Sequence, residues 1–242
     1  MSILFYLTYG GNALFEITEK KKEESAKDYV VRTLIYNLVH TNLIPGQQLY
    51  EQELCSQMNV SRTPFREGVL ELAQRQLIDI RPKIGTYVSF IDPDIVEEIR
   101  HLRSVLESEL AVLACSCLTE EDINRLWENI ALWKMYIQRN QEEKIFALDK
   151  DFHRLIYESC HHMYWHRLVE NVAPHFDRTT ILSFRCKPLG NILADHEELV
   201  CAFEQRNPAL AQKISRRHME RYRENLSAIR ETFPEYFQKR TH

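Results

Sequence analysis

The stretch "VSRTPFREGVLELAQRQ" at residues 60–76 has the pattern of a helix that carries two arginines, Arg62 and Arg66, one turn apart at its start. A DNA-binding helix-turn-helix presents side chains from this end of its second helix to the major groove. The alternative interpretation is a capped surface helix with two solvated arginines. The sequence on either side of this stretch therefore has to decide between DNA recognition and an ordinary solvated face.

Local signals define the start of this helix. Ser61 or Thr63 can cap it, and Pro64 is tolerated in a first turn, where no backbone hydrogen bond is lost. On the inner face of the helix we expect four apolar residues, Val69, Leu70, Leu72 and Ala73.

The segments around the stretch complete a recognisable module. Apolar residues at helical spacing over 30–39 follow a cap at Ser25, and a short helix over 50–58 precedes Asn59, which tolerates the left-handed conformation of a helix end. The period then changes over 77–91, which favours two short strands joined by a turn at "RPKIG", residues 81–85. Three helices followed by a two-stranded hairpin predict a winged helix-turn-helix.

Composition limits the possible functions. The 242-residue chain is 44% hydrophobic and 27% charged, as expected of a globular protein, and its formal net charge is −4. An acidic chain does not coat nucleic acid over its whole surface, but DNA binding depends on local charge. Six cysteines without a paired spacing indicate reduced thiols in a cytoplasmic protein. The apolar start "MSILFYLTYGG" is too short to span a membrane and is expected to be a strand or an ordered arm.

The second half of the chain is expected to be entirely helical. Asp92-Pro93 begins it, and the expected helices cover 93–116, 120–138, 143–160, 164–182, 189–206 and 208–230. One face of the first helix is expected to carry Ile95, Ile99, Leu102, Leu106, Leu110 and Leu113. The fold class is thus mostly α, with an arm (1–24), a winged helix-turn-helix (25–91), a six-helix bundle (92–232) and a tail (233–242).

Histidines in the helical half suggest a metal site. Asp149 and His153 lie at positions i and i+4 and so share one helix face, while His196 and His218 lie on separate expected helices. One carboxylate and three imidazoles suit a divalent ion such as zinc or nickel. Spacing alone leaves two alternatives open: ordinary surface or core histidines, and the rival i, i+4 pair His162 and His166.

The segment 46–88 closely resembles the DNA-binding domain of the GntR family of bacterial transcription regulators, whose signature "VSRTPFRE" nearly reproduces. The sequence departs from the family pattern at Asn59, Gly68 and Gln76, which do not remove DNA-contacting groups. The resemblance implies that the protein reads double-stranded DNA, and that the contacts come from Gln52, Ser61, Arg62, Thr63, Arg66, Lys83 and Gly85.

Residues 93–230 resemble the FCD ligand-binding domain of the FadR-type branch, in its metal-binding form. The resemblance rests on four marks: Arg103 with Glu107, the motif Asp149, Phe152 and His153, then His196, and finally His218. It implies metal ligands at Asp149, His153, His196 and His218. It also implies a homodimer that reads a pseudo-palindromic operator and binds a small carboxylate effector, with Arg103 and Arg178 as candidate partners. A helix-surface salt bridge with Glu107 is the alternative role for Arg103.

A different class of function is a metal-dependent hydrolase with an accessory winged helix. Glu197 or Glu198, beside His196, could then act as the base. The sequence does not supply a second catalytic group at a recognisable spacing. We therefore expect a ligand-responsive transcription regulator and not an enzyme.

Overall fold

The computed structural model describes residues 15–186 and 190–237, which fold into two compact units. The first unit holds the described residues up to Pro93 together with residues 233–237, and the second runs from Asp94 to Thr232. Most of the expected N-terminal arm, residues 1–14, lies outside the described residues. Phe15 and Ile17, which are described, pack against the core of the first unit.

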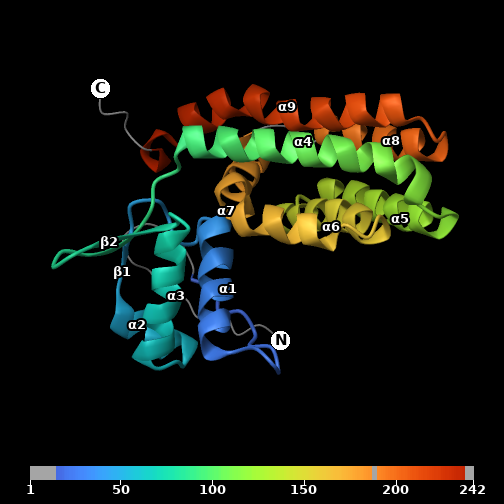
Figure 1. Cartoon of the computed structure of the whole chain (residues 1–242). Helices are drawn as coiled ribbons and strands as arrows, with labels where there is room; N and C mark the ends of the chain where they lie inside the picture. Colours follow the sequence, from blue (N-terminus) through green and yellow to red (C-terminus); the bar gives the residue numbers. More distant parts are fainter. Residues whose placement is uncertain (1–14, 187–189, 238–242) are drawn as a thin grey trace. The chain divides into compact units, whose positions relative to one another are not determined.

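The first unit is a winged helix-turn-helix (Figure 1). Its elements are α1 (Ala26–Val39), β1 (Gln48–Leu49), α2 (Glu51–Met58), α3 (Arg62–Gln74), β2 (Ile78–Arg81) and β3 (Gly85–Val88). The strands form an antiparallel sheet in the order β1-β3-β2, with Ile78 opposite Val88 and Gln48 opposite Tyr87. Strand β1 was not expected, because two residues show no period. The segment after the bundle returns to this unit, where Ile91 pairs with Phe237.

The helix that begins in the signature stretch packs on α1 with a face that differs in part from the expected one. Val69 and Leu72 are buried as expected, but Leu70 is 55% exposed. Phe65 and Gly68 are buried instead. The expectation for Leu70 was therefore wrong, because Leu70 points about 100° away from Val69, beyond the buried face that Phe65, Gly68, Val69 and Leu72 form. Asn59 has the expected left-handed conformation, with φ 52°.

Gly68 allows this close contact between α3 and α1. A Cβ atom at residue 68 would lie 2.8 Å from Cγ1 of Val30, which is fully buried and branched at Cβ. Alanine is better than glycine in a helix by about 1 kcal/mol, but overpacking of a tight core costs roughly 1–3 kcal/mol. The steric term is therefore the larger one.

We expect the Gly68→Ala substitution to lower the stability of the first unit by about 1 kcal/mol. Urea denaturation of the full chain, followed on the first transition, measures this change. A double variant that also carries Val30→Ala should lose less than the sum of the two single losses, because the truncation makes room for the new methyl group. A gain in stability from Gly68→Ala alone would contradict the packing argument.

The second unit is a bundle of six helices (Figure 1). The helices are α4 (Pro93–Cys117), α5 (Glu120–Gln138), α6 (Glu142–Ser159), α7 (Met163–Cys186), α8 (Gly190–Glu204) and α9 (Pro208–Thr232). Each agrees with its expected range to within a few residues. Thr119 and Asp122 form the capping box at the start of α5 that "TEED" predicts. The mostly α fold class is confirmed.

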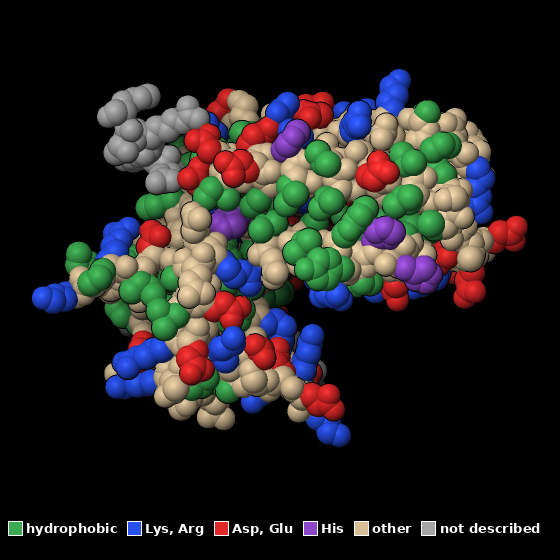
Figure 2. Space-filling model, viewed as in Figure 1, with side chains coloured by type: hydrophobic (Ala, Val, Ile, Leu, Met, Phe, Trp, Pro, Cys, Tyr) green, Lys and Arg blue, Asp and Glu red, His purple; other side chains and the backbone are tan. Residues whose placement is uncertain are grey.

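Helix α4 turns a more polar face inward than expected. Ile99 and Leu110 are buried, but so are Arg100, Arg103 and Glu107. Leu102, which was expected on the buried face, is 42% exposed, so that expectation was wrong. Figure 2 shows hydrophobic side chains gathered along α4 on the visible face of the bundle. The apolar pattern misplaced the inner face because charged residues occupy part of it.

Two further observations concern membranes and disulfides. Within the described ranges, none of the helices is long and apolar enough to cross a membrane. All six cysteines are described and free, three of them buried.

Candidate DNA-binding surface and metal centre

Helix α3 presents its first turn to solvent. Arg62 and Arg66 are exposed, with side chains 65% and 64% accessible, and Ser61 and Thr63 beside them are exposed as well. Ser61 occupies the N-cap position, as expected. Among the described residues its side chain makes no capping hydrogen bond. The first turn therefore offers two guanidinium groups and two hydroxyls on one surface.

Both guanidinium groups contact one carboxylate, that of Glu51 at the start of α2. Arg66 donates from Nε to Oε2 of Glu51 at 2.7 Å and from Nη2 to Oε1 at 3.0 Å. Nε of Arg62 lies 3.5 Å from Oε1 of the same carboxylate. The hydrogen bond from Arg66 lowers the pKa of Glu51 despite partial burial, and the charges of Arg66 and Arg62 act in the same direction.

The wing supplies the second group of candidate DNA contacts. Lys83 is exposed at the tip of the β2–β3 hairpin and has a positive φ of 65°. Gly85, two residues further on, has a φ of 157°, a backbone conformation that residues with a Cβ rarely adopt, so the hairpin itself favours a glycine at this position. Gln52, in the first turn of α2, is exposed. All seven sequence-predicted contacts thus lie in the first unit, six of them exposed and Gly85 half-buried.

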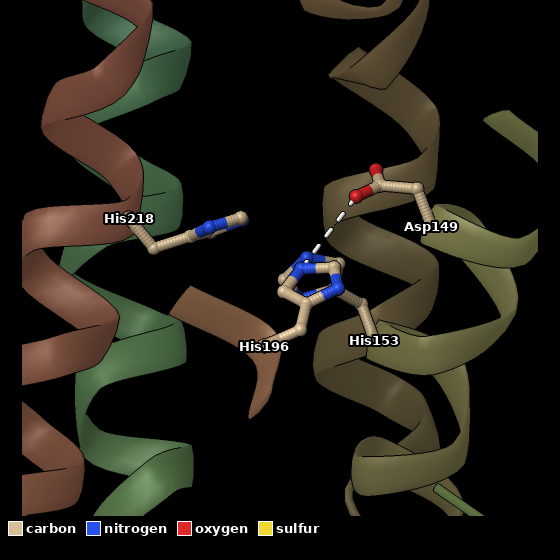
Figure 3. A group of neighbouring side chains, drawn as sticks. All are labelled: Asp149, His153, His196 and His218. Carbon is tan, nitrogen blue, oxygen red and sulfur yellow. Dashed lines mark ion pairs between the residues drawn. The ribbon is translucent and has the colours of Figure 1, made fainter. Parts of the chain in front are cut away.

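The four expected metal ligands come together inside the second unit. Asp149 and His153 project from α6, His196 comes from α8 and His218 from α9 (Figure 3). One potential ligand atom from each residue lies within 4.8 Å of those of the other three. Nε2 of His196 is 3.7 Å from Oδ1 of Asp149. Helix α6 and the consecutive helices α8 and α9 thus place one carboxylate and three imidazoles around one point.

Burial makes unpaired nitrogens in this cluster costly. His196 is fully buried, and Phe152 stacks on its ring with centroids 4.1 Å apart. Neither nitrogen of His196 has a hydrogen-bond partner among the described residues, and the same holds for Nε2 of His153. Burial, together with the nearby His218, His153 and Arg103, holds the pKa of His196 well below its usual value. A neutral imidazole with a nitrogen lone pair is the form that binds a metal ion.

A buried carboxylate orients the first of the three imidazoles. Nδ1 of His153 lies 3.0 Å from Oε2 of Glu107, whose other oxygen accepts from Nε of Arg103 at 2.7 Å. Burial would raise the pKa of Glu107, but the charges of Arg103 and His153 outweigh it and hold that pKa well below its usual range. The contact to Nδ1 leaves Nε2 of His153 as the nitrogen that can bind a metal. Arg103 therefore pairs with Glu107, the partner in its alternative role, but the pair is buried in the bundle and not on a helix surface.

A second buried carboxylate, Asp195, lies beside His218. Its Oδ2 is 3.8 Å from Nδ1 of His218, and it contacts Arg217 at 2.7 Å and Arg221 at 3.0 Å. Burial opposes ionisation of Asp195, but its hydrogen bonds and the charges of these neighbours hold its pKa well below the usual range. Sequence reasoning missed Asp195. The signal was present in the acidic residue directly before His196.

A cavity opens on one side of the ligand cluster. The cavity has a volume of about 50 Å³ and opens to solvent, and two of the clustered residues, Asp149 and His218, line it. Its other lining residues combine aromatic, hydroxyl, amide and guanidinium groups: Arg103, Phe176, Thr180, Ser183, Phe184, Ile192, Met219, Arg221, Tyr222 and Asn225. Arg178 lies in the core with 1% exposure and, within the described residues, outside this lining; burial lowers its pKa to about 10.

The alternative histidine pair and the two candidate catalytic bases lie outside the ligand cluster. His162 contacts Trp165 edge-on and His166 contacts Tyr157, and neither belongs to the ligand cluster. Of the two candidate bases, Glu197 pairs with Lys134 and Glu198 lies 2.9 Å from Arg217.

A winged helix-turn-helix with an exposed arginine pair, joined to an all-helical domain, defines the class of DNA-binding transcription regulators. Residues 26–88 match the family described as bacterial regulatory proteins, gntR family, and residues 98–221 match the FCD domain. The chain belongs to the GntR family and carries an FCD domain, as the resemblance implied. Because these families and the chain's relatives are transcription regulators and not enzymes, the hydrolase alternative does not hold.

Similar proteins agree over nearly the whole chain. The HTH-type transcriptional repressor RspR of Escherichia coli K12 is 28% identical over 221 residues, which cover 91% of this chain and 97% of the repressor. An HTH-type regulator from an unstable DNA locus of Streptomyces ambofaciens is 32% identical over 81% of this chain and 82% of its own length. Among solved structures, E. coli McbR/YncC superimposes with a TM-score of 0.74 at 20% identity, over 87% of this chain and 99% of that one. That structure supports the fold alone.

Proposed function

We propose that this transcription regulator acts in the cytoplasm as a homodimer on a pseudo-palindromic operator. We further propose that a small carboxylate effector, bound at a divalent metal ion in the FCD domain, controls its DNA binding. The observation that carries the effector proposal is the cluster of Asp149 and three histidines, two of whose members line a cavity.

The proposed DNA contacts rest on exposure and chemistry. Arg62 and Arg66 can reach a groove, and the planar fork of an arginine matches the O6 and N7 acceptors of guanine. Ser61, Thr63 and Gln52 offer neutral donors for phosphate oxygens nearby. Lys83 at the tip of the wing offers a positive charge to the backbone of the duplex.

The residues of the cluster fit a borderline divalent ion such as zinc or nickel. Buried nitrogens of His153 and His196 that lack hydrogen-bond partners among the described residues are the donors such an ion needs. Bound there, the ion would act as a Lewis acid that attracts an anionic ligand. Glu107 orients His153 and Asp195 lies beside His218, which prepares both rings for coordination.

The effector is proposed to be a small carboxylate because the cavity combines the metal ligands with Arg103 and Arg221. Both guanidinium groups already have acidic partners, so they offer their remaining N–H groups as directional donors. Arg178 lies outside the described lining and has no part in this proposal, although the sequence made it a candidate. An effector can shift DNA binding only if it has different affinities for two states of the protein.

The homodimer is supported by an apolar stripe on α4. Leu102 and Val105 are three residues apart and therefore share a face, and both are large, apolar and exposed. Ile95 and Val112 extend the same stripe as half-buried residues. A second copy of the chain would cover this stripe, and two-fold symmetry would match the two halves of a palindromic operator.

Thermal unfolding of the full chain against a panel of small carboxylates, with and without a chelator, tests the effector proposal. A ligand at a hundredfold excess over its Kd should raise the melting temperature by about 5 °C or more, because it stabilises only the folded state. The chelator should abolish the rise. The amide of the same acid is the matched control and should produce little shift. An equal rise in the presence of chelator would contradict a metal-dependent carboxylate site.

A further inference from the structure

The contact between Glu51 and Arg66 leaves one edge of the guanidinium group available. Arg66 uses Nε and one N–H of Nη2 to hold the two oxygens of Glu51 at 2.7 and 3.0 Å. The remaining N–H groups belong to Nη1 and to the outer side of Nη2. These two nitrogens form the end of the planar fork, the edge that fits guanine O6 and N7 together. Glu51 therefore occupies the side of Arg66 that guanine does not need.

The same contact fixes a side chain that would otherwise be mobile. The side chain of Arg66 is 64% exposed, and an exposed arginine loses rotamer freedom whenever it makes a directed contact. Two hydrogen bonds to one carboxylate hold the fork before DNA arrives. Arg66 then loses less rotamer freedom when DNA binds, which favours the guanine contact that this fixed orientation fits.

Glu51 also weakens the attraction between the two arginines and DNA phosphates, which does not depend on the base sequence. Its negative charge lies beside two positive ones, since Arg62 is 3.5 Å away on the same carboxylate. Phosphates attract arginines regardless of sequence, and this term dominates non-specific binding. A carboxylate between the arginines weakens that term while leaving the outer edge of Arg66 for a base.

The fold holds Glu51 in this place. Glu51 is the first residue of α2, where the N-terminal end of the helix dipole favours a negative charge. Glu53 lies in the same first turn but accepts instead from Gln57 on its own helix, at 3.3 Å. The two acidic residues of this turn therefore have different partners, and of the two only Glu51 contacts Arg62 and Arg66 among the described residues.

We infer that Glu51 is a positioning residue for DNA recognition: it orients Arg66 for guanine and raises the preference of the protein for its operator over other DNA. This inference rests on the proposed role of Arg66 in reading DNA. It assigns sequence discrimination to a residue that does not itself need to touch the duplex.

The test measures discrimination as a ratio of two affinities. The wild-type full chain first selects a duplex from a random-sequence library, and a scrambled duplex of the same composition serves as its competitor. Kd values for both duplexes are measured at one salt concentration. In Glu51→Gln the ratio should fall about tenfold, with weaker binding to the selected duplex and equal or tighter binding to the scrambled one. Glu51→Asp, which keeps the charge but shortens the reach, should also lose discrimination.

Glu53→Gln is the matched control, since it removes the same charge from the same helical turn. It should change both affinities alike and leave the ratio within about twofold of wild type. In an Arg66→Ala background, Glu51→Gln should have a much smaller effect on the ratio, because only the charge beside Arg62 is then removed. An unchanged ratio in Glu51→Gln, or an equal loss in Glu53→Gln, would overturn the inference. If Arg66→Ala alone left the ratio at its wild-type value, the proposed DNA contact of Arg66 would fail first.

Discussion

Replacing Arg66 by alanine is expected to weaken binding to a library-selected duplex by ten- to a hundredfold, which corresponds to about 1–3 kcal/mol for one bidentate base contact. The side chain of Arg66 is 64% exposed, and its hydrogen bonds go to one carboxylate, that of Glu51, which is itself partly exposed. The fold should therefore survive, and the melting temperature should stay within a degree or two of wild type. A gel-shift titration at several salt concentrations measures the effect, and it should saturate at two chains per duplex if the dimer proposal is correct.

Two control variants separate base recognition from charge. Arg66→Lys keeps the positive charge but loses the planar fork, so the salt dependence should stay close to wild type while affinity for the selected duplex falls. Arg125→Ala removes an exposed arginine from α5 in the other unit and should leave DNA binding unchanged. Wild-type affinity in Arg66→Ala would show that this arginine is merely solvated, the alternative that the sequence left open.

The winged helix-turn-helix could be predicted because several independent local signals coincide there. Asn59 takes the left-handed conformation that its position requires, and the strands of the wing fall within a residue or two of the expected ranges. The exposure of Arg62 and Arg66 also agrees with the pattern. Their joint contact with Glu51 could not be read from the sequence, because the residues lie on different helices separated by a turn.

The predictions of buried residues failed on α3 and α4, where the buried face of the helix is not made of large apolar side chains alone. On α3 the glycine at position 68 provides close packing but contributes no hydrophobic signal, so Leu70 was assigned to the core in error. On α4 the inner face includes Arg103 and Glu107, which are buried because they compensate each other and orient His153. A pattern search that counts only apolar residues assigns such a face to solvent, and it misplaced Leu102 for this reason.

The cluster of metal ligands shows a different limit of prediction from sequence. Spacing supplied only Asp149 and His153, one turn apart on a single helix. His196 and His218 were candidates on separate expected helices, but only the resemblance to the FCD domain selected them over other histidines, since helix packing decides which of ten histidines meet. The structure brings them together with Asp149 and His153, and it places His162 and His166 outside the group.

The metal assignment predicts the second large effect. Purified wild-type protein should contain about one divalent ion per chain, and His218→Ala should lose most of it, because removing one of four ligands weakens a metal site strongly. His218 is half-buried at the cavity, so its truncation should be tolerated better than that of the fully buried His196. Elemental analysis after dialysis measures the metal content, and circular dichroism verifies that the variant remains folded.

The rival histidine pair provides the control. His166→Ala removes a partly buried imidazole from α7 that contacts Tyr157 and lies outside the cluster, so its metal content should equal that of wild type. Asp149→Asn, which keeps the size of the side chain but removes its charge, should lose metal like His218→Ala. If His218→Ala and Asp149→Asn kept a full complement of metal while His166→Ala lost it, the ion would belong to the other pair. The carboxylate effector would then have no metal beside the cavity that Asp149 and His218 line.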